Sequence, residues 1–363
     1  MSPIHLFTPG PTHIPERILK AMSIQELHHR TSQFRTVFQE TAELLRSVTN
    51  APTAPLFLSC SGSGAMEAVV ANSVGRESTL GYLDAGKFGE RWGDIAKAKS
   101  LNAIALKLEW GESPSIDAVR DFLTANPSIT HFAMQYCETS TTVLHDVPAI
   151  AEMMRGEFPG VLVLIDAISA ATTLEMPLDS MHWDAVVFAS QKAFMLPPGF
   201  SMVHLSERFW AAAEKISPGT MYFDLTLERK SQAKGDAAWT PVTTLLLGLK
   251  EALTIFQEEG WKNVYQRHAA CRERCFEWFE KLGIQPVNAD HGSPSVTGGC
   301  FTDGKVDAEQ LRGSLAKEYG FRIAGGQDHW KGKVLRFGHM GIIAPEDLDR
   351  CFAALQKLLL KAN

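Results

Sequence analysis

The chain has 363 residues, of which 45% are apolar and 21% charged, and its formal net charge is −6. The length favours two domains over one, and the acidic balance argues against a duplex-binding protein, which is usually basic. No apolar run approaches the ~20 residues of a membrane span, and the first residues do not have the pattern of a signal peptide.

Taken in chain order, the proline-rich residues 1–14 predict an extended arm, because proline disrupts a helix interior. Apolar runs typical of strands then alternate with segments whose apolar residues have helical spacing. The strand-like runs are 55–59, 79–83, 102–108, 129–136, 161–166, 185–189 and 201–205, and the helical spacings are 33–49, 64–74, 89–99, 115–125 and 147–157. This alternation predicts an α/β domain with a mainly parallel seven-stranded sheet and helices on both faces.

The pattern changes in the last third of the chain. Residues 242–282 have helical spacing, and shorter strands and helices follow, with strands at 297–302, 321–324 and 333–337 and helices at 307–318 and 346–361. These elements predict a smaller α+β unit. We therefore divide the chain into an arm at 1–14, a large domain at 15–258 and a small C-terminal domain at 259–363.

Ligands of open α/β sheets bind outside the carboxyl ends of the strands, so the segments after the strands carry the first functional clues. SGSGAMEA at 61–68 leads from a strand into a helix, where free N–H groups suit a phosphate. Capping of that helix by Ser61 or Ser63 explains the same residues. The hydroxyls of ETST at 138–141 either bind a ligand or complete a turn.

Two later strands end in groups of opposite charge. Asp166 follows an apolar run, where a carboxylate needs a partner, and Lys192 lies 26 positions later, after the next strand. A strand-end acid capping the next helix, a buried ion pair, or a Schiff-base lysine with an acid for a cofactor's ring nitrogen would each fit this pattern. Arg336, on a strand of the small unit, is either structural or a clamp for a carboxylate.

Other chemistries lack their signatures. No HExxH motif or cluster of cysteine and histidine predicts a metal site, and no GxSxG motif predicts a hydrolase. The dinucleotide fingerprint fails because Glu67 stands where its last glycine belongs. Six scattered cysteines without a CxxC pair predict reduced thiols and a cytoplasmic location.

The order of these motifs resembles that of the class V aminotransferases of the alanine–glyoxylate and serine–pyruvate type, which have fold type I and use pyridoxal 5′-phosphate. The resemblance spans essentially the whole chain. Its motifs are TPGPT at 8–12, HHRTSQF at 28–34, SGSGAMEA at 61–68, ETST at 138–141, LIDAIS at 164–169, SQKAFMLPPG at 190–199, TPV at 240–242 and LRFGHMG at 335–341.

The resemblance implies a role for each of these positions. Lys192 would form the Schiff base and carry the proton between substrate and cofactor, and Asp166 would pair with the pyridine nitrogen. Arg336 would bind the substrate carboxylate, with Gly10 and Pro11 lining the substrate side. The remaining implied cofactor contacts are Ser61, Gly62, Ser63 and Gln191 at the phosphate, Phe88 stacked on the ring, Ser140 near its phenolic oxygen, and Thr240 reaching the phosphate of the neighbouring subunit.

The sequence departs from the family pattern at three positions. Phe88 replaces a tryptophan or tyrosine of many relatives, Ala237 replaces a phosphate-binding tyrosine, and Thr142 replaces a glycine. None of these changes removes a catalytic group.

By this resemblance the protein is a homodimeric transaminase that moves the amino group of a small amino acid, such as alanine or serine, to a 2-oxo acid such as glyoxylate or pyruvate. The ETSTT segment also resembles 2-aminoethylphosphonate transaminases, which are the first alternative. A lyase or a desulfurase using Cys300, and a non-catalytic subunit on the same fold, are further alternatives.

Overall fold

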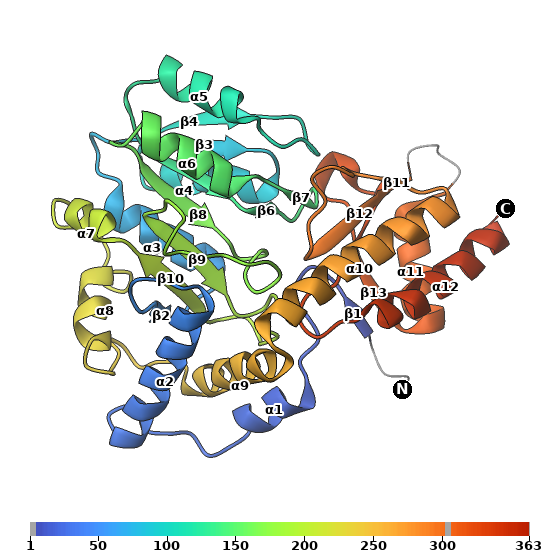
Figure 1. Ribbon diagram of the computed structural model, residues 1–363, viewed down its shortest axis with the longest axis horizontal. Coiled ribbons are helices and arrows are strands. Elements are labelled where there is room, and N and C mark those ends of the chain that lie inside the picture. The colour runs from blue at the N-terminus through green and yellow to red at the C-terminus, as the bar shows by residue number, and fades with distance from the viewer. Residues whose placement is uncertain (1–4, 302–305, 363) are drawn as a thin grey trace.

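The computed structural model describes residues 5–301 and 306–362, and its described strands form a large sheet, a small sheet and a two-stranded ribbon (Figure 1). The large sheet has seven strands in the spatial order β2-β10-β9-β8-β5-β3-β4. Their bounds are β2 Leu56–Leu58, β3 Thr79–Asp84, β4 Asn102–Lys107, β5 Ile129–Gln135, β8 Leu162–Asp166, β9 Ala185–Ala189 and β10 Ser201–Leu205. All seven correspond to the runs predicted from the sequence.

The large sheet is parallel except at one strand. β10 runs antiparallel to both β9 and β2, whereas β9, β8, β5, β3 and β4 are mutually parallel. Since β2 and β9 are both antiparallel to β10, they run in the same direction. The segments that follow β2, β3, β5, β8 and β9 therefore all leave the sheet at one edge.

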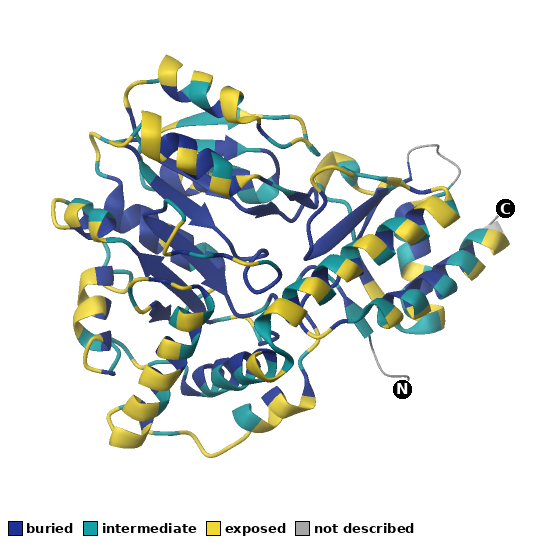
Figure 2. Cartoon of the chain, in the orientation of Figure 1, coloured by how far each residue is buried: buried dark blue, intermediate teal, exposed yellow. Residues whose placement is uncertain are grey.

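Both faces of the large sheet are largely buried, as its almost continuously apolar strands require, except at the edge strand β4, which has no buried residue. Val163 and Ile165 of β8 belong to a core with α2 (Ser32–Val48), α5 (Ile116–Ala125), α6 (Val147–Glu157) and α9 (Thr243–Glu259). Leu164 faces the other core, with α3 (Gly62–Ser73), α4 (Lys87–Ala98), α7 (Glu207–Ala213) and α8 (Leu225–Gln232). Figure 2 shows the buried strands between helices whose outer surfaces are exposed.

The small sheet gathers the two ends of the chain. Its strands, in the order β1-β13-β14-β12-β11, are β1 His5–Phe7, β13 Phe321–Gly325, β14 Val334–Gly338, β12 Val296–Cys300 and β11 Gln285–Pro286. α10 (Trp261–Leu282), α11 (Ala308–Tyr319) and α12 (Pro345–Ala362) cover it, and Phe7, Phe279 and Phe337 lie in their common core. The N-terminal arm thus contributes a strand to the small sheet.

The helical stretch predicted at 242–282 consists of α9 and α10, which meet at Gly260. Gly260 has φ of 86°, a conformation that glycine adopts without steric cost and that ends α9. The division that we predicted near residue 258 lies close to this junction and stays a prediction.

Several short elements were not expected from the sequence. They are α1 (Glu16–Met22), α7, α8, β1, the β6 (Cys137–Glu138) and β7 (Val143–Leu144) ribbon, β11, and the 3-10 turn η1 (Asp328–Trp330). Among the described helices, none combines the length and the apolar character needed to cross a membrane.

Candidate active site

The acid and the amine predicted from the sequence leave neighbouring strands at the same edge of the large sheet. β8 and β9 are hydrogen-bonded parallel neighbours, with Asp166 paired to Val187. Asp166 is the last residue of β8, and Lys192 lies three positions beyond the end of β9. Parallel pairing therefore places both side chains at the carboxyl edge, where ligands of such sheets bind.

Lys192 is buried and its amine is held by the N-terminal arm. The residue is 7% exposed, and Nζ donates a hydrogen bond of 2.5 Å to the carbonyl oxygen of Pro9. The hydroxyl of Thr12 donates to the Lys192 carbonyl at 2.8 Å. A Cβ atom at Gly10 would lie 2.6 Å from Cδ of Lys192, so only glycine allows the arm to pass this close.

Burial changes the protonation of this amine. It lowers the pKa of Lys192 from 10.5 to about 8, whereas the nearby charge of Asp166 acts in the opposite direction. The neutral amine, which is the nucleophile and the base, is therefore accessible near physiological pH.

Asp166 is 5% exposed, and its Oδ1 accepts the N–H of Ile168 at 2.8 Å. Burial raises its pKa to about 6, while this hydrogen bond and the charges of Arg91 and Lys192 favour the ionised form. The segment after Asp166 is a series of turns rather than a helix, so the interpretation of this acid as a helix cap is wrong. A carboxylate remains available at the end of β8.

The SGSG segment begins helix α3 at the same edge. Ser61 occupies the N-cap position but makes no side-chain capping hydrogen bond, so the alternative of a simple cap by this serine is wrong. A Cβ at Gly62 would lie 2.4 Å from Cδ1 of Ile168 and 3.1 Å from Cβ of Ala189. Glycine is therefore needed for the first turn of α3 to approach the sheet, and its N–H groups face the edge where a phosphate would bind.

Aromatic and polar side chains complete this edge of the sheet. Nζ of Lys192 lies 5.7 Å from the centroid of the Phe88 ring, and the guanidinium of Arg91 lies 4.9 Å from it. Ser140 is fully buried and its hydroxyl bonds to the carboxylate of Glu138 at 2.5 Å. Among the described residues, the side-chain oxygen of Gln191 is buried without a hydrogen-bond partner.

Arg336 brings a cation from the small sheet to this edge. It is 6% exposed, and its Nε donates to the carbonyl of Gly325 at 2.9 Å. A second nitrogen donates to the carbonyl of Thr139, in the large unit, at 2.8 Å. Burial lowers the pKa of Arg336 to about 10, opposed by the charge of Glu138, so the guanidinium stays charged at neutral pH and is fixed in orientation.

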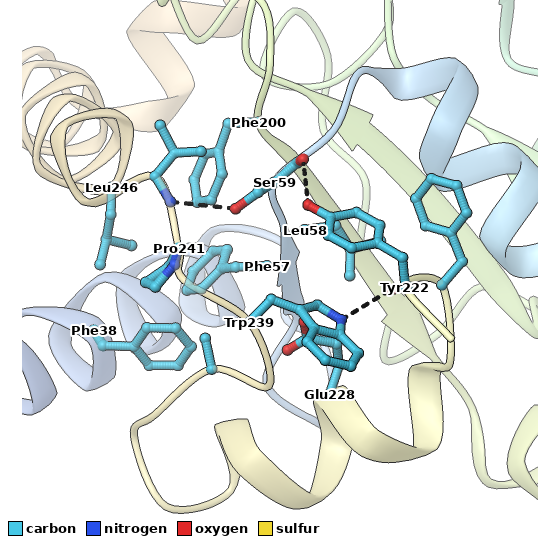
Figure 3. A pocket seen from close by; sticks show the side chains of 13 residues that line it. Phe38, Phe57, Leu58, Ser59, Phe200, Tyr222, Glu228, Trp239, Pro241 and Leu246 are labelled. Carbon is cyan, nitrogen blue, oxygen red and sulfur yellow. Dashed lines mark hydrogen bonds between the residues drawn. The ribbon is translucent and has the colours of Figure 1, made fainter. Parts of the chain in front are cut away.

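Thr240 is the predicted site residue that the structure leaves apart from this cluster. It is exposed, on the segment between α8 and α9. The neighbouring Trp239 and Pro241 line an apolar pocket against Ser59 (Figure 3). The N–H of Val242 and the hydroxyl of Tyr222 both donate to Ser59, at 3.2 and 3.0 Å. This segment thus packs close to the start of the SGSG loop, with Thr240 facing outward. Pro11 is also exposed.

These residues fit pyridoxal phosphate. The cofactor requires an amine for its aldehyde, an acid for its ring nitrogen, and donors for its phosphate. Lys192, Asp166 and the first turn of α3 meet these requirements at one edge. Among the described residues, no group of three or more histidine, cysteine, aspartate or glutamate side chains is arranged to hold a metal ion.

Four contributors to this edge were not identified from the sequence: the Pro9 carbonyl, Thr12, Arg91 and Glu138. Thr12 and Glu138 lie inside motifs that mark the family resemblance, TPGPT and ETST. Both contact residues about 50 or more positions away, which no local pattern reveals.

Comparisons with known proteins agree with this geometry. The family model described as aminotransferase class-V matches residues 4–335. A serine–glyoxylate aminotransferase of Methylorubrum extorquens is 30% identical over 347 residues, which cover 93% of this chain and 86% of that protein.

Solved structures agree as well. An aspartate aminotransferase of subgroup IV from Thermus thermophilus is 31% identical, with a TM-score of 0.90 over 99% of this chain and 100% of that one. An alanine–glyoxylate aminotransferase from Nostoc sp. is 28% identical, with a TM-score of 0.92 over 99% of this chain and 96% of that one. The chain therefore belongs to the class V aminotransferase family, and it is an aminotransferase with the fold-type I architecture.

Proposed function

We propose that the protein is a pyridoxal-phosphate-dependent transaminase that moves the amino group of a small amino acid to glyoxylate. The observation that carries this proposal is the buried amine of Lys192, with a pKa lowered to about 8, at the same sheet edge as the carboxylate of Asp166. An amine that is neutral near physiological pH and an ionised acid on the neighbouring strand are the pair that such a cofactor needs.

Each residue then has a separate task. Pyridoxal phosphate, when bound, supplies the electron sink for the carbanion formed at the substrate α-carbon. Lys192 would anchor the cofactor through its amine and, once displaced, would carry the α-proton from the substrate to the cofactor. Asp166 would keep the ring nitrogen protonated, and Phe88 would cover the ring. Gly10 and Pro11 would line the substrate side.

The substrate α-carboxylate would bind to Arg336, whose orientation is already fixed by the carbonyls of Gly325 and Thr139. The first turn of α3, which lacks a side-chain cap, supports phosphate binding by Ser61, Gly62 and Ser63. We propose Gln191, next to Lys192 in sequence, as the fourth phosphate contact. Because Arg336 recognises a group that all α-amino acids share, the choice of donor depends on other contacts.

The relatives support glyoxylate as the acceptor. The names of the Methylorubrum and Nostoc proteins share glyoxylate but differ in the donor, which is serine in one and alanine in the other. We propose alanine or serine as the donor, with pyruvate as a second acceptor. The desulfurase alternative is disfavoured because Cys300 lies in β12 and burial raises the pKa of its thiol, which opposes thiolate formation.

We also propose a homodimer with shared active sites, in the cytoplasm. Met221 and Tyr222 are 69% and 42% exposed, and Tyr222 stacks on Trp239, which precedes Thr240 (Figure 3). Exposed apolar side chains of this size are typical of an interface, and a second copy covering them would bring Thr240 to the partner's phosphate. The six cysteines are free thiols, which fits a reducing compartment.

The proposed substrates are tested by mixing the cofactor-loaded protein with single amino acids and recording its visible absorption. We expect alanine or serine to abolish the band of the lysine-bound cofactor, and glyoxylate to restore it. Lys192→Ala is the control and should bind cofactor without this cycle. Failure of both amino acids, with a response to 2-aminoethylphosphonate alone, would contradict the proposal and favour the phosphonate transaminase.

The lowered pKa of Lys192 predicts how cofactor attachment depends on pH. Because the neutral amine is the nucleophile, the rate of attachment to the cofactor-free protein should rise with pH and level off above about pH 8. Asp166→Asn should shift this profile to lower pH, since the carboxylate raises the pKa of the amine. Stopped-flow absorbance measures the rate. A rate that still rises beyond pH 10 would show that the amine is unperturbed.

The role of Arg336 predicts a change in KM. Arg336→Gln removes charged hydrogen bonds to the substrate carboxylate, which should raise KM for the amino acid by about 30-fold or more, from a loss of about 2 kcal/mol. Steady-state kinetics measure KM for both variants. The control is Arg322→Gln, a change at an exposed arginine of β13. Equal KM values for the two variants would refute carboxylate binding by Arg336.

The dimer predicts that a charge at its interface disrupts both assembly and cofactor binding. Met221→Glu should give a monomer in analytical ultracentrifugation, with weakened cofactor affinity because Thr240 no longer reaches the partner. Leu360→Glu, a change at a residue that is 72% exposed in α12, is the matched control and should remain a dimer. A Met221→Glu monomer with full activity would rule out shared sites.

A further inference from the structure

We propose that Glu138 is a positioning residue, whose buried carboxylate holds the first turn of α4 and thereby sets the place of the Phe88 ring against the cofactor. This inference deepens the proposed function and rests on it, because the ring matters only if a cofactor lies there. Glu138 is not among the groups whose chemistry the transaminase needs, and it touches no reacting atom.

The carboxylate is enclosed by hydrogen-bond donors. Glu138 is 0% exposed. Its Oε2 accepts the N–H of Gly89 at 2.9 Å and the amide of Gln135 at 3.1 Å. Its Oε1 accepts the N–H and the hydroxyl of Ser140, at 3.1 and 2.5 Å. The N–H of Phe88 lies between the two oxygens, 3.3 and 3.2 Å away. Both oxygens therefore face donors only.

Helix α4 depends on these contacts because it has no cap of its own. Its N-cap residue is Gly86, which has no side chain to accept a hydrogen bond. The hydroxyl of Ser140 instead accepts the N–H of Lys87 at 3.0 Å, and Glu138 accepts the next two N–H groups. Side chains some 50 positions away thus satisfy amides that a helix normally caps locally.

The approach of Glu138 to the helix requires a glycine. A Cβ at Gly86 would lie 2.4 Å from the Ser140 hydroxyl oxygen and 2.6 Å from the Glu138 carboxyl carbon. The helix N-terminus also carries positive partial charge, which favours an anion at this position. Gly86 therefore makes room for the carboxylate, and the helix N-terminus favours its negative charge.

The turn that carries Glu138 also contacts the other groups of the site. The Thr139 carbonyl accepts a hydrogen bond from Arg336 at 2.8 Å, and the Thr139 hydroxyl bonds to Ser169 at 2.6 Å, three residues after Asp166. Residues 138–140 thus contact the first turn of α4, which carries the Phe88 ring, as well as Arg336 and the segment that follows Asp166. A shift of this turn would misplace all three.

A glutamine at this position separates the role of charge from that of size. In Glu138→Gln one carboxylate oxygen becomes an NH₂ group. Whichever oxygen is replaced, the NH₂ group faces at least two hydrogen-bond donors, so those hydrogen bonds are lost. The side chain keeps its size, so no cavity forms. We expect amide exchange in residues 86–92 of the cofactor-free protein to accelerate about tenfold, as for a lost helix cap. In the loaded protein the cofactor dissociation constant should rise about tenfold, with a weaker visible circular dichroism band.

The matched control is Asp184→Asn. Asp184 is also a fully buried carboxylate of the large unit, and it accepts from the N–H of Val163 at 2.9 Å and the hydroxyl of Ser206 at 2.8 Å. It lies just before β9, at the opposite edge of the sheet from Lys192. We expect both variants to lower the melting temperature, but only Glu138→Gln to change exchange at 86–92 and the circular dichroism band.

Hydrogen-exchange mass spectrometry of the cofactor-free protein separates this inference from the transaminase proposal. Unchanged exchange at 86–92 in Glu138→Gln would overturn the positioning role even if the enzyme is a transaminase. Faster exchange in a protein that never binds cofactor would support the contact while refuting the function. If Glu138→Gln does not fold, Gly86→Ala, which displaces the same carboxylate, replaces it and should give the same changes.

Discussion

The site depends on one constraint, which is the burial of the Lys192 amine at the end of a central strand. Removing an amine from water disfavours its charged form, and here the cost is limited by the Pro9 carbonyl and by the carboxylate of Asp166 on the adjacent strand. The same burial makes the amine neutral enough to react. The N-terminal arm, the parallel pairing of β8 and β9 and the glycine at position 10 all maintain this arrangement.

The two units of the chain are joined through this edge by polar contacts. Arg336 extends from the small sheet to the Thr139 carbonyl, and the arm that begins as β1 of the small sheet continues across Lys192. The turn around Glu138 meets the first turn of α4 on one side and Arg336 on the other. The groups that we assign to the cofactor and to the substrate therefore share one scaffold, whose position depends on a few buried hydrogen bonds.

The sequence predicted the large sheet well because its strands are apolar runs separated by helical spacings, and the order of the motifs indicated the family. It was less informative where a structure depends on distant partners. α8 is short and mostly polar, and its burial of Leu225 against the sheet leaves no periodic signal. No local pattern indicated a role for Glu138, since its donors on α4 lie about 50 positions earlier.

The most direct test of the central claim is to reduce the cofactor-loaded protein with borohydride, digest it and locate the cofactor by mass spectrometry. We predict a single modified lysine, Lys192, because it is the amine that burial has made neutral at the edge shared with Asp166. Attachment at another lysine, or recovery of all the cofactor unattached, would contradict the assignment of this edge as the active site.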